Sequence, residues 1–263
     1  MREESGMRNL CRALCASVLL LCGLYANAAL AAPDEIQVYT DEMNAPGEFG
    51  LEQHINYTLS GTQLPDYPGQ LPSQRLLQLT PEFSYGLSSS LEAGLYLPLA
   101  LAADGNSYLN GLRLRLKYVA PRVGSEGWFY GANVEAGRSH LRISESASGM
   151  ELRPLLGYRA PDWLLSFNPI LNAALEGVDQ QPRFEPALKS SYRVWAGVHA
   201  GLECYGEYGA LNALLPASQR AHTLYGVIDV ATPRFDVNFG IGHGLANAAD
   251  AWVLKAIVAL PLK

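Results

Sequence analysis

The chain alternates apolar and basic residues at positions 112–118, where it reads Leu112-Arg113-Leu114-Arg115-Leu116-Lys117-Tyr118. Successive side chains of a β-strand point to opposite faces, so a strand places the leucines on one face and the basic residues on the other. An α-helix has 3.6 residues per turn and would mix the two sets around its surface. The stretch therefore predicts a β-strand with one apolar face and one charged face.

The same period of two continues along most of the chain after residue 48. Between residues 49 and 60 the odd positions are mostly apolar and the even positions are polar. Further alternating runs, separated by turn-forming residues, predict more strands. The predicted set of about 12 strands covers residues 49–60, 77–85, 91–99, 112–118, 127–138, 149–160, 162–176, 182–194, 197–209, 220–232, 234–245 and 250–262. The predicted fold class is therefore all-β.

The predicted connections alternate in length along the chain. Short connections fall at residues 86–90, 120–126, 159–162, 194–197 and 232–234, and mostly longer ones at 61–73, 102–108, 139–149, 176–181 and 211–219. Short turns that alternate with longer loops are typical of bacterial outer-membrane barrels. We therefore predict a transmembrane antiparallel up-and-down β-barrel.

A soluble β-barrel or β-sandwich is the alternative, because it also shows a period of two. Two observations favour the membrane. Apolar faces persist across nearly every predicted strand. Aromatic residues also fall near the predicted strand ends, as in the girdles of membrane barrels; they are Tyr57, Tyr85, Tyr118, Trp128, Tyr158, Trp163, Tyr192 and Trp252. Prolines within the strands count against both readings, since each removes a ladder donor; they are Pro81, Pro154, Pro169 and Pro186.

The N-terminal residues have the pattern of an export signal. Arg8 and Arg12 precede an uncharged stretch at residues 13–32 that ends in small residues. A basic region, a short apolar core and an A-x-A exit indicate a cleaved signal peptide, and the core is shorter than the ~20 residues of a spanning helix. Cleavage after Ala28 or Ala31 fits the rule. We expect a signal peptide at residues 1–31, a solvated periplasmic segment at 32–46 and the barrel at 47–263.

The charge balance argues against nucleic acid as a partner. Removal of residues 1–31 takes away three arginines and two glutamates, which leaves 16 basic and 23 acidic side chains and a net charge of −7. Nucleic-acid-binding proteins carry basic surfaces that neutralise phosphates. The mature chain is acidic and has no such excess of basic residues.

The polar faces of the predicted strands place charges of both signs inside the barrel. Buried charges cost several kcal/mol each unless they are paired. Either the charges pair across a narrow interior and fill it, or Arg113, Arg115 and Lys117 face acidic residues across a wet pore, with Glu92 and Glu135 on the neighbouring strands. The lumen-facing candidates are Glu52, His54, Glu82, Glu92, Arg113, Arg115, Lys117, Glu135, Arg153, Glu203, Asp229 and Lys255.

Enzymatic chemistry has little support in the sequence. A hydrolase needs a nucleophile, a base and an orienting acid. His54 or His199 could pair with a serine on a neighbouring strand, but no G-x-S-x-G motif accompanies them. No His/Cys cluster has metal-ligand spacing, so we predict no catalytic residue, metal ligand or cofactor. Gly240, Gly242 and Gly244 are expected to make room inside the barrel.

Several short motifs resemble a known bacterial family, the one labelled for the meta-pathway of phenol degradation. They are DEIQVY at 34–39, EMNAPGEFGLEQHINY at 42–57, PEFSYG at 81–86, EAGLYLP at 92–98, FEPAL at 184–188, GLE at 201–203 and WVLKA at 252–256. The resemblance implies an outer-membrane β-barrel. It also implies a role in moving aromatic or other hydrophobic compounds, and it carries no functional residues with it.

These observations predict a barrel in the bacterial outer membrane that passes or binds small solutes, including aromatic or hydrophobic ones. A lipid-modifying enzyme of the outer membrane is the second hypothesis, and a structural or adhesive barrel is the third. The expected partners are outer-membrane lipid, lipopolysaccharide, small solutes and, during biogenesis, the barrel-assembly machinery.

Overall fold

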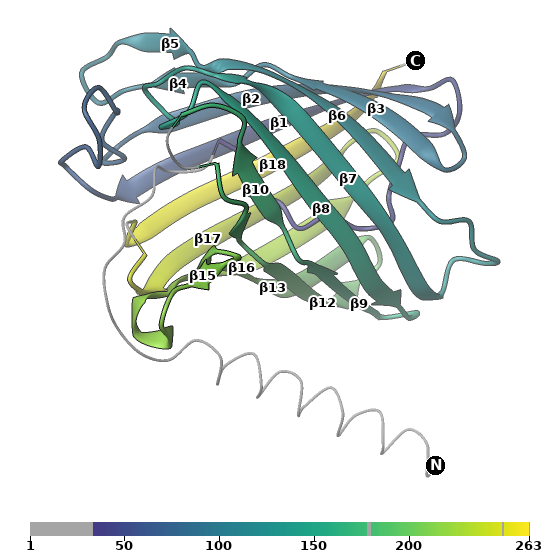
Figure 1. Cartoon of the computed structure of the whole chain (residues 1–263). Helices are drawn as coiled ribbons and strands as arrows, with labels where there is room; N and C mark the ends of the chain where they lie inside the picture. The colour runs from purple at the N-terminus through teal and green to yellow at the C-terminus, as the bar shows by residue number, and fades with distance from the viewer. Residues whose placement is uncertain (1–33, 178–179, 249, 263) are drawn as a thin grey trace.

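The computed structural model describes residues 34–177, 180–248 and 250–262, and it forms one closed β-barrel (Figure 1). The predicted signal peptide at residues 1–31 lies outside the described residues. All strand pairings are antiparallel, and β1 (Phe49–Ser60) pairs with both β2 (Leu77–Ser88) and β18 (Trp252–Leu262), which closes the sheet. No helix among the described residues is long and apolar enough to cross a membrane.

Twelve barrel strands result when interrupted strands are joined. Six of them are continuous: β1, β2, β18, β7 (Gly127–Ser139), β8 (Ser148–Arg159) and β17 (Asp236–Ala246). The other six are built from paired pieces: β3 (Leu91–Tyr96) with β4 (Leu99–Leu101), β5 (Ser107–Leu109) with β6 (Gly111–Val119), β9 (Trp163–Asn168) with β10 (Leu171–Ala174), β11 (Arg183–Phe184) with β12 (Ala187–Trp195), β13 (Val198–Glu207) with β14 (Gly209–Ala210), and β15 (Ala213–Leu214) with β16 (Ala221–Ala231). The predicted all-β, 12-stranded barrel is confirmed.

Prolines account for three of the interruptions. Pro98, Pro169 and Pro186 each lie between the two pieces of a strand, where the missing N–H breaks the ladder. Pro81 instead lies inside β2, and its carbonyl accepts a hydrogen bond from Leu97 N at the break between β3 and β4 (3.1 Å). Pro98, Pro169 and Pro186 are therefore accommodated as local breaks, whereas Pro81 and Pro154 lie within continuous strands, and the sheet stays closed.

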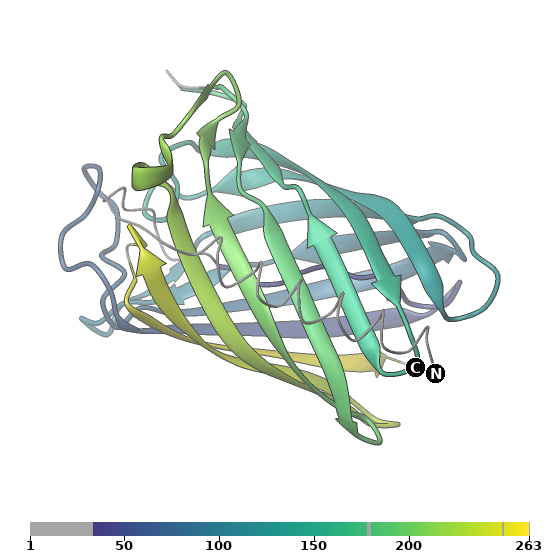
Figure 2. The ribbon, with the colours of Figure 1, turned by 90° about the horizontal axis from the view of Figure 1, so that it is seen from below.

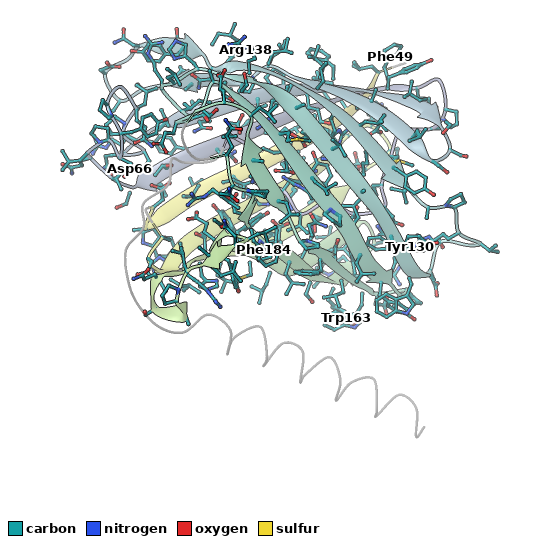
Figure 3. The ribbon with its side chains drawn as sticks, in the orientation of Figure 1. Phe49, Asp66, Tyr130, Arg138, Trp163 and Phe184 are labelled. Atoms are coloured by element: carbon teal, nitrogen blue, oxygen red, sulfur yellow. The ribbon has the colours of Figure 1, made fainter. Side chains whose placement is uncertain are left out.

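The connections place mostly short turns at one end of the barrel and mostly longer loops at the other; the exceptions are the two-residue β14–β15 connection at residues 211–212 and the β6–β7 connection at residues 120–126. The short-turn end carries the connections after β2, β6, β8, β12 and β16, and the long-loop end carries those after β1, β4, β7, β10, β14 and β17. Phe49, Tyr130 and Trp163 lie toward the short-turn end, while Asp66 and Arg138 lie at the long-loop end (Figure 3).

The outer face of the barrel is apolar. On β6, Leu112, Leu114 and Leu116 are 44%, 59% and 48% exposed. Arg115 and Lys117, which alternate with them, are 6% and 4% exposed. Aromatic pairs surround the short-turn end, with ring centroids 4.5–5.3 Å apart: Phe49 with Tyr85, Trp128 with Tyr158, and Trp163 with Tyr192. An apolar outer wall with an aromatic girdle is the surface that a membrane barrel presents to lipid.

Glycine makes room inside the wall at β17. A Cβ added to Gly242 would lie 2.3 Å from the Tyr225 ring, and one added to Gly244 would lie 2.3 Å from the Asp250 carbonyl oxygen. The absence of side chains therefore lets Tyr225 lie against the inner surface of the sheet.

Residues 34–44 run through the interior of this barrel, whereas residues 45–48 are exposed at its short-turn end (Figures 1 and 2). Gly47 N donates to Gly86 O at the short-turn end (2.8 Å), and Asp34 O accepts from Thr80 Oγ1 near the middle of β2 (3.1 Å). Sequence analysis predicted a solvated periplasmic segment at residues 32–46. Glu42, Ala45 and Pro46 are exposed, but the rest of residues 34–44 are buried or half-buried, which differs from that prediction. The side chains of the buried residues match the interior charges and apolar patches that the strands present. We call residues 34–46 the luminal segment.

Candidate functional site in the barrel lumen

The luminal segment is extended and presents two different faces to the wall. Ile36 packs with Tyr225, Val227 and Val253, and Val38 packs with Ile170 and Ala187. The odd positions point to the opposite side of the lumen, where Glu35 and Tyr39 meet arginines and tyrosines. The even positions thus contact apolar patches on β12, β16, β18 and at Ile170, whereas the odd positions face a charged side of the lumen formed by β2, β3, β6 and β8.

On the charged side, Arg115 joins two strands through acidic residues. Its Nη2 lies 2.6 Å from both Glu82 Oε1 and Glu92 Oε1. His54 Nε2 lies 3.2 Å from Glu82 Oε2, and both side chains are fully buried. The Arg115 guanidinium also faces the rings of Tyr39 and Tyr96. The sequence correctly suggested Glu92 as a partner of Arg115.

A second charged group ties the luminal segment to β6, β7 and β8. Arg113 lies 3.0 Å from Asp34, 3.1 Å from Glu35 and 3.5 Å from Glu135. Arg153 binds Glu151 (2.6 Å) and donates to Gln37 O (3.0 Å). The sequence placed Glu135 on a neighbouring strand as a partner for the basic residues of β6, and its direct cross-strand neighbour is Arg115. Its ion pair goes instead to Arg113, because the Arg115 guanidinium is held by β2 and β3.

A third group lies on the opposite wall. Lys255 bonds to Glu203 and donates to Ile36 O (3.1 Å). Lys189 lies 3.3 Å from Glu203 and 2.8 Å from Asp229, while Tyr205 donates to Glu203 (2.6 Å). Two lysines and two acidic residues therefore neutralise one another on this wall, with no contribution from the charged side formed by β2, β3, β6 and β8.

The luminal segment is also clamped at the short-turn end. Asp41 binds both Arg122 and Arg159, and Arg159 reaches Glu42 (3.0 Å). Asn44 donates to Glu92 through its backbone N (2.6 Å) and its side chain (2.9 Å). These contacts favour the interpretation in which charge pairs fill the interior over the wide wet pore.

Two of the predicted lumen-facing residues, Glu52 and Lys117, have no ion pair in the part of the chain that the structure describes. Both line a cavity of about 500 Å³ between the luminal segment and the wall. The cavity reaches the short-turn end, because the connection between β16 and β17 also lines it. It is a space inside the barrel that a small molecule could occupy.

Metal binding and hydrolysis are the two other kinds of chemistry that this geometry tests. Ligand atoms of Glu52, His54 and Glu82 lie within 4.8 Å of one another, a grouping that could hold a metal ion. The Arg115 guanidinium already binds Glu82 in that group, and it supplies the positive charge there. For a hydrolase, no histidine–serine hydrogen bond is found among residues 34–177, 180–248 and 250–262, and His54 pairs with Glu82.

Sequence reasoning missed the luminal segment and the grouping of Glu52, His54 and Glu82. Both left a signal in the sequence. Ile36 and Val38 alternate with Glu35, Gln37 and Tyr39, which is the two-faced pattern of an extended segment with distinct surroundings. The grouping follows from register alone, since Glu52 and His54 share one face of β1 and Glu52 lies opposite Glu82.

Structural comparison relates this barrel to outer-membrane channels. The COG4313 outer membrane channel from Pseudomonas putida F1 matches with a TM-score of 0.58 and 14% identity, over 87% of this chain and 100% of that chain. The KdgM porin and the NanC porin match with TM-scores of 0.56 and 0.55 and identities of 6% and 10%, each over 81% of this chain and 99% of theirs. The shared feature is the fold. No protein-family profile and no curated protein matches the sequence.

Proposed function

We propose that the protein is an outer-membrane channel that conducts small solutes through a narrow lumen occupied in part by its own luminal segment. The observation that carries this proposal is the closed barrel whose apolar outer wall surrounds a polar interior with a cavity of about 500 Å³. The likeness to the COG4313 channel and to two porins supports it. The motifs quoted above, together with that likeness, support membership of the family labelled for the meta-pathway of phenol degradation.

Location follows from the outer surface. The belt of exposed leucine, phenylalanine and tyrosine side chains would be costly in water and is matched to lipid. We expect outer-membrane lipid and lipopolysaccharide around the belt, and the barrel-assembly machinery as the partner during biogenesis. The lipid-modifying enzyme remains the weaker hypothesis, because neither His54 nor His199 bonds to a serine in the described residues.

Solute size should decide passage through this channel. The luminal segment and its ion pairs narrow the interior, so single-ring solutes are expected to permeate faster than disaccharides. Swelling of liposomes that contain the purified protein measures both rates, with protein-free liposomes as the control. Swelling no faster than in the protein-free control, for every solute class, would contradict the proposal.

A further inference from the structure

Lys117 is a buried cation in the wall of the cavity, and its hydrogen-bonding capacity is largely unused. The side chain is on β6, and the residue is 4% exposed. Its Nζ donates to the backbone carbonyl of Glu42 (2.6 Å) and faces the Tyr39 ring (5.0 Å to the centroid). A lysine ammonium has three donors. Two are left for another acceptor, and burial makes an acceptor with negative charge the most stabilising one.

The carboxylates nearest in the fold are engaged elsewhere. Glu92 lies directly opposite Lys117 across the β3–β6 pair. Its oxygens bind Arg115 (2.6 Å) and Asn44 (2.6 and 2.9 Å). The Glu42 carboxylate turns toward Arg159 (3.0 Å), so only its backbone carbonyl reaches Lys117. The chain therefore supplies Lys117 with a dipole in place of a counter-ion.

Glu52 on β1 is an acidic residue that, like the basic Lys117, has no ion pair among the described residues. It also lines the cavity, and its only hydrogen bond among the described residues is a long one from Gln37 Nε2 (3.4 Å). No ion pair to it is present in the described part of the chain. Among the charged lining residues that are not exposed, Lys117 and Glu52 have no ion pair in the described part of the chain, whereas Lys189 is paired with both Glu203 and Asp229. Arg234 and Asp236 also line the cavity without an ion pair to any described residue, but both are exposed at the short-turn end.

The rest of the cavity suits an apolar body. Val38 and Ile257, both at least 95% buried, line it together with Met43. Its volume of about 500 Å³ lies within the roughly 300–1,000 Å³ of small-molecule pockets, which combine apolar walls with a few fixed polar groups. A ligand could place its hydrocarbon part against these side chains.

We propose that the cavity binds a small organic acid with an apolar body and a hydrogen-bond donor close to its carboxylate, as in an amino acid or a hydroxy acid. The carboxylate binds Lys117 and the donor binds Glu52. This inference rests on the proposed function, because it identifies a class of solute for the same lumen.

Four probes with one phenyl ring separate these contacts: phenylalanine, mandelate, phenylacetate and 2-phenylethanol. Calorimetric titration of the purified full-length protein in detergent measures their affinities without any need for transport. Hydrogen bonds to charged groups correspond to roughly tenfold or more in affinity. We therefore expect phenylalanine or mandelate to bind about tenfold or more tightly than phenylacetate, and phenylethanol to bind weakest. Tighter binding of phenylalanine than of mandelate would indicate an amino acid, and tighter binding of mandelate would indicate a hydroxy acid.

Variants test each contact separately. Lys117→Met should lower the affinity for all three acids by about tenfold or more, and Lys117→Arg should restore most of it. Glu52→Gln should lower the affinity for phenylalanine or mandelate to that of phenylacetate. Arg138→Gln, which removes a positive charge at the long-loop end, should change nothing. Slower migration after heating in detergent gels shows that each variant is folded.

Three outcomes overturn the proposal: no probe binds the wild-type protein, phenylethanol binds as tightly as the acids, or Lys117→Met binds them like the wild type. If Lys117→Met does not fold, the affinities of the four probes for the wild-type protein and for Glu52→Gln still test the proposal. Failure of the channel itself would be seen separately, as binding in the calorimeter without swelling of liposomes.

Discussion

Leu114→Arg is expected to prevent assembly of the barrel in membranes. Leu114 lies in the middle of β6 on the outer face and is 59% exposed. An arginine facing the bilayer midplane costs about 2–4 kcal/mol, a large share of the roughly 5–15 kcal/mol that stabilises a protein. The measurement is the fraction of outer-membrane protein that migrates differently before and after heating. We expect this fraction to fall to a small part of the wild-type value.

Leu64→Arg is the matched control for this prediction. Leu64 lies in the connection between β1 and β2 at the long-loop end and is 78% exposed. The same substitution there meets water, so assembly should be normal. Equal assembly of the two variants would mean that the outer face of β6 does not contact lipid.

Lys255→Met is expected to destabilise the folded barrel by about 3 kcal/mol, because removal of one partner from a buried ion pair leaves the other charge uncompensated. The Lys255 side chain is fully buried between Glu203 and the Ile36 carbonyl. The methionine fills a similar volume, so packing is largely kept. Unfolding by guanidinium of the detergent-refolded protein measures the loss.

Two further variants identify the cause of that loss. Addition of Glu203→Gln to Lys255→Met removes the orphaned negative charge and should recover part of the stability. Arg138→Met, at an exposed position of β7, should have little effect. A loss for Lys255→Met no larger than that for Arg138→Met would show that the buried ion pairs do not hold the interior together.

The barrel itself could be predicted because strand faces obey a local rule. Alternation at residues 112–118 assigned the leucines to the outside and Arg113, Arg115 and Lys117 to the inside, and the structure has the same arrangement. Period two and turn spacing depend only on neighbouring residues, so strand number and phase can be read without knowledge of contacts that are distant in the chain.

The occupant of the lumen could not be predicted by the same rule. Tyr39 donates its backbone N–H to Asn168, 129 residues away, and accepts a hydrogen bond from Ser166. Residues 34–46 are mostly polar, and a polar stretch before the first strand has the composition of a solvated tail. Its burial depends on charged residues of β1, β3, β6, β8 and β18 that only the closed barrel brings together.

Ion-pair partners were predictable only in part for a related reason. Cross-strand register places Arg115 opposite Glu135 and next to Gly94. Long side chains reach diagonal neighbours and across the lumen, so Arg115 binds Glu82 and Glu92, and Arg113 takes Glu135. Register therefore restricts the possible partners, and the packing of the interior selects among them.

The conductance of single channels in planar bilayers tests the central claim most directly, when the full mature chain is compared with a variant that lacks residues 34–46. The claim is that this barrel is a channel narrowed by its own luminal segment. It predicts small conductance for the full chain and several-fold larger conductance for the deletion variant, with both proteins folded as judged by their migration before and after heating. A folded deletion variant that conducts no more than the full chain would contradict it.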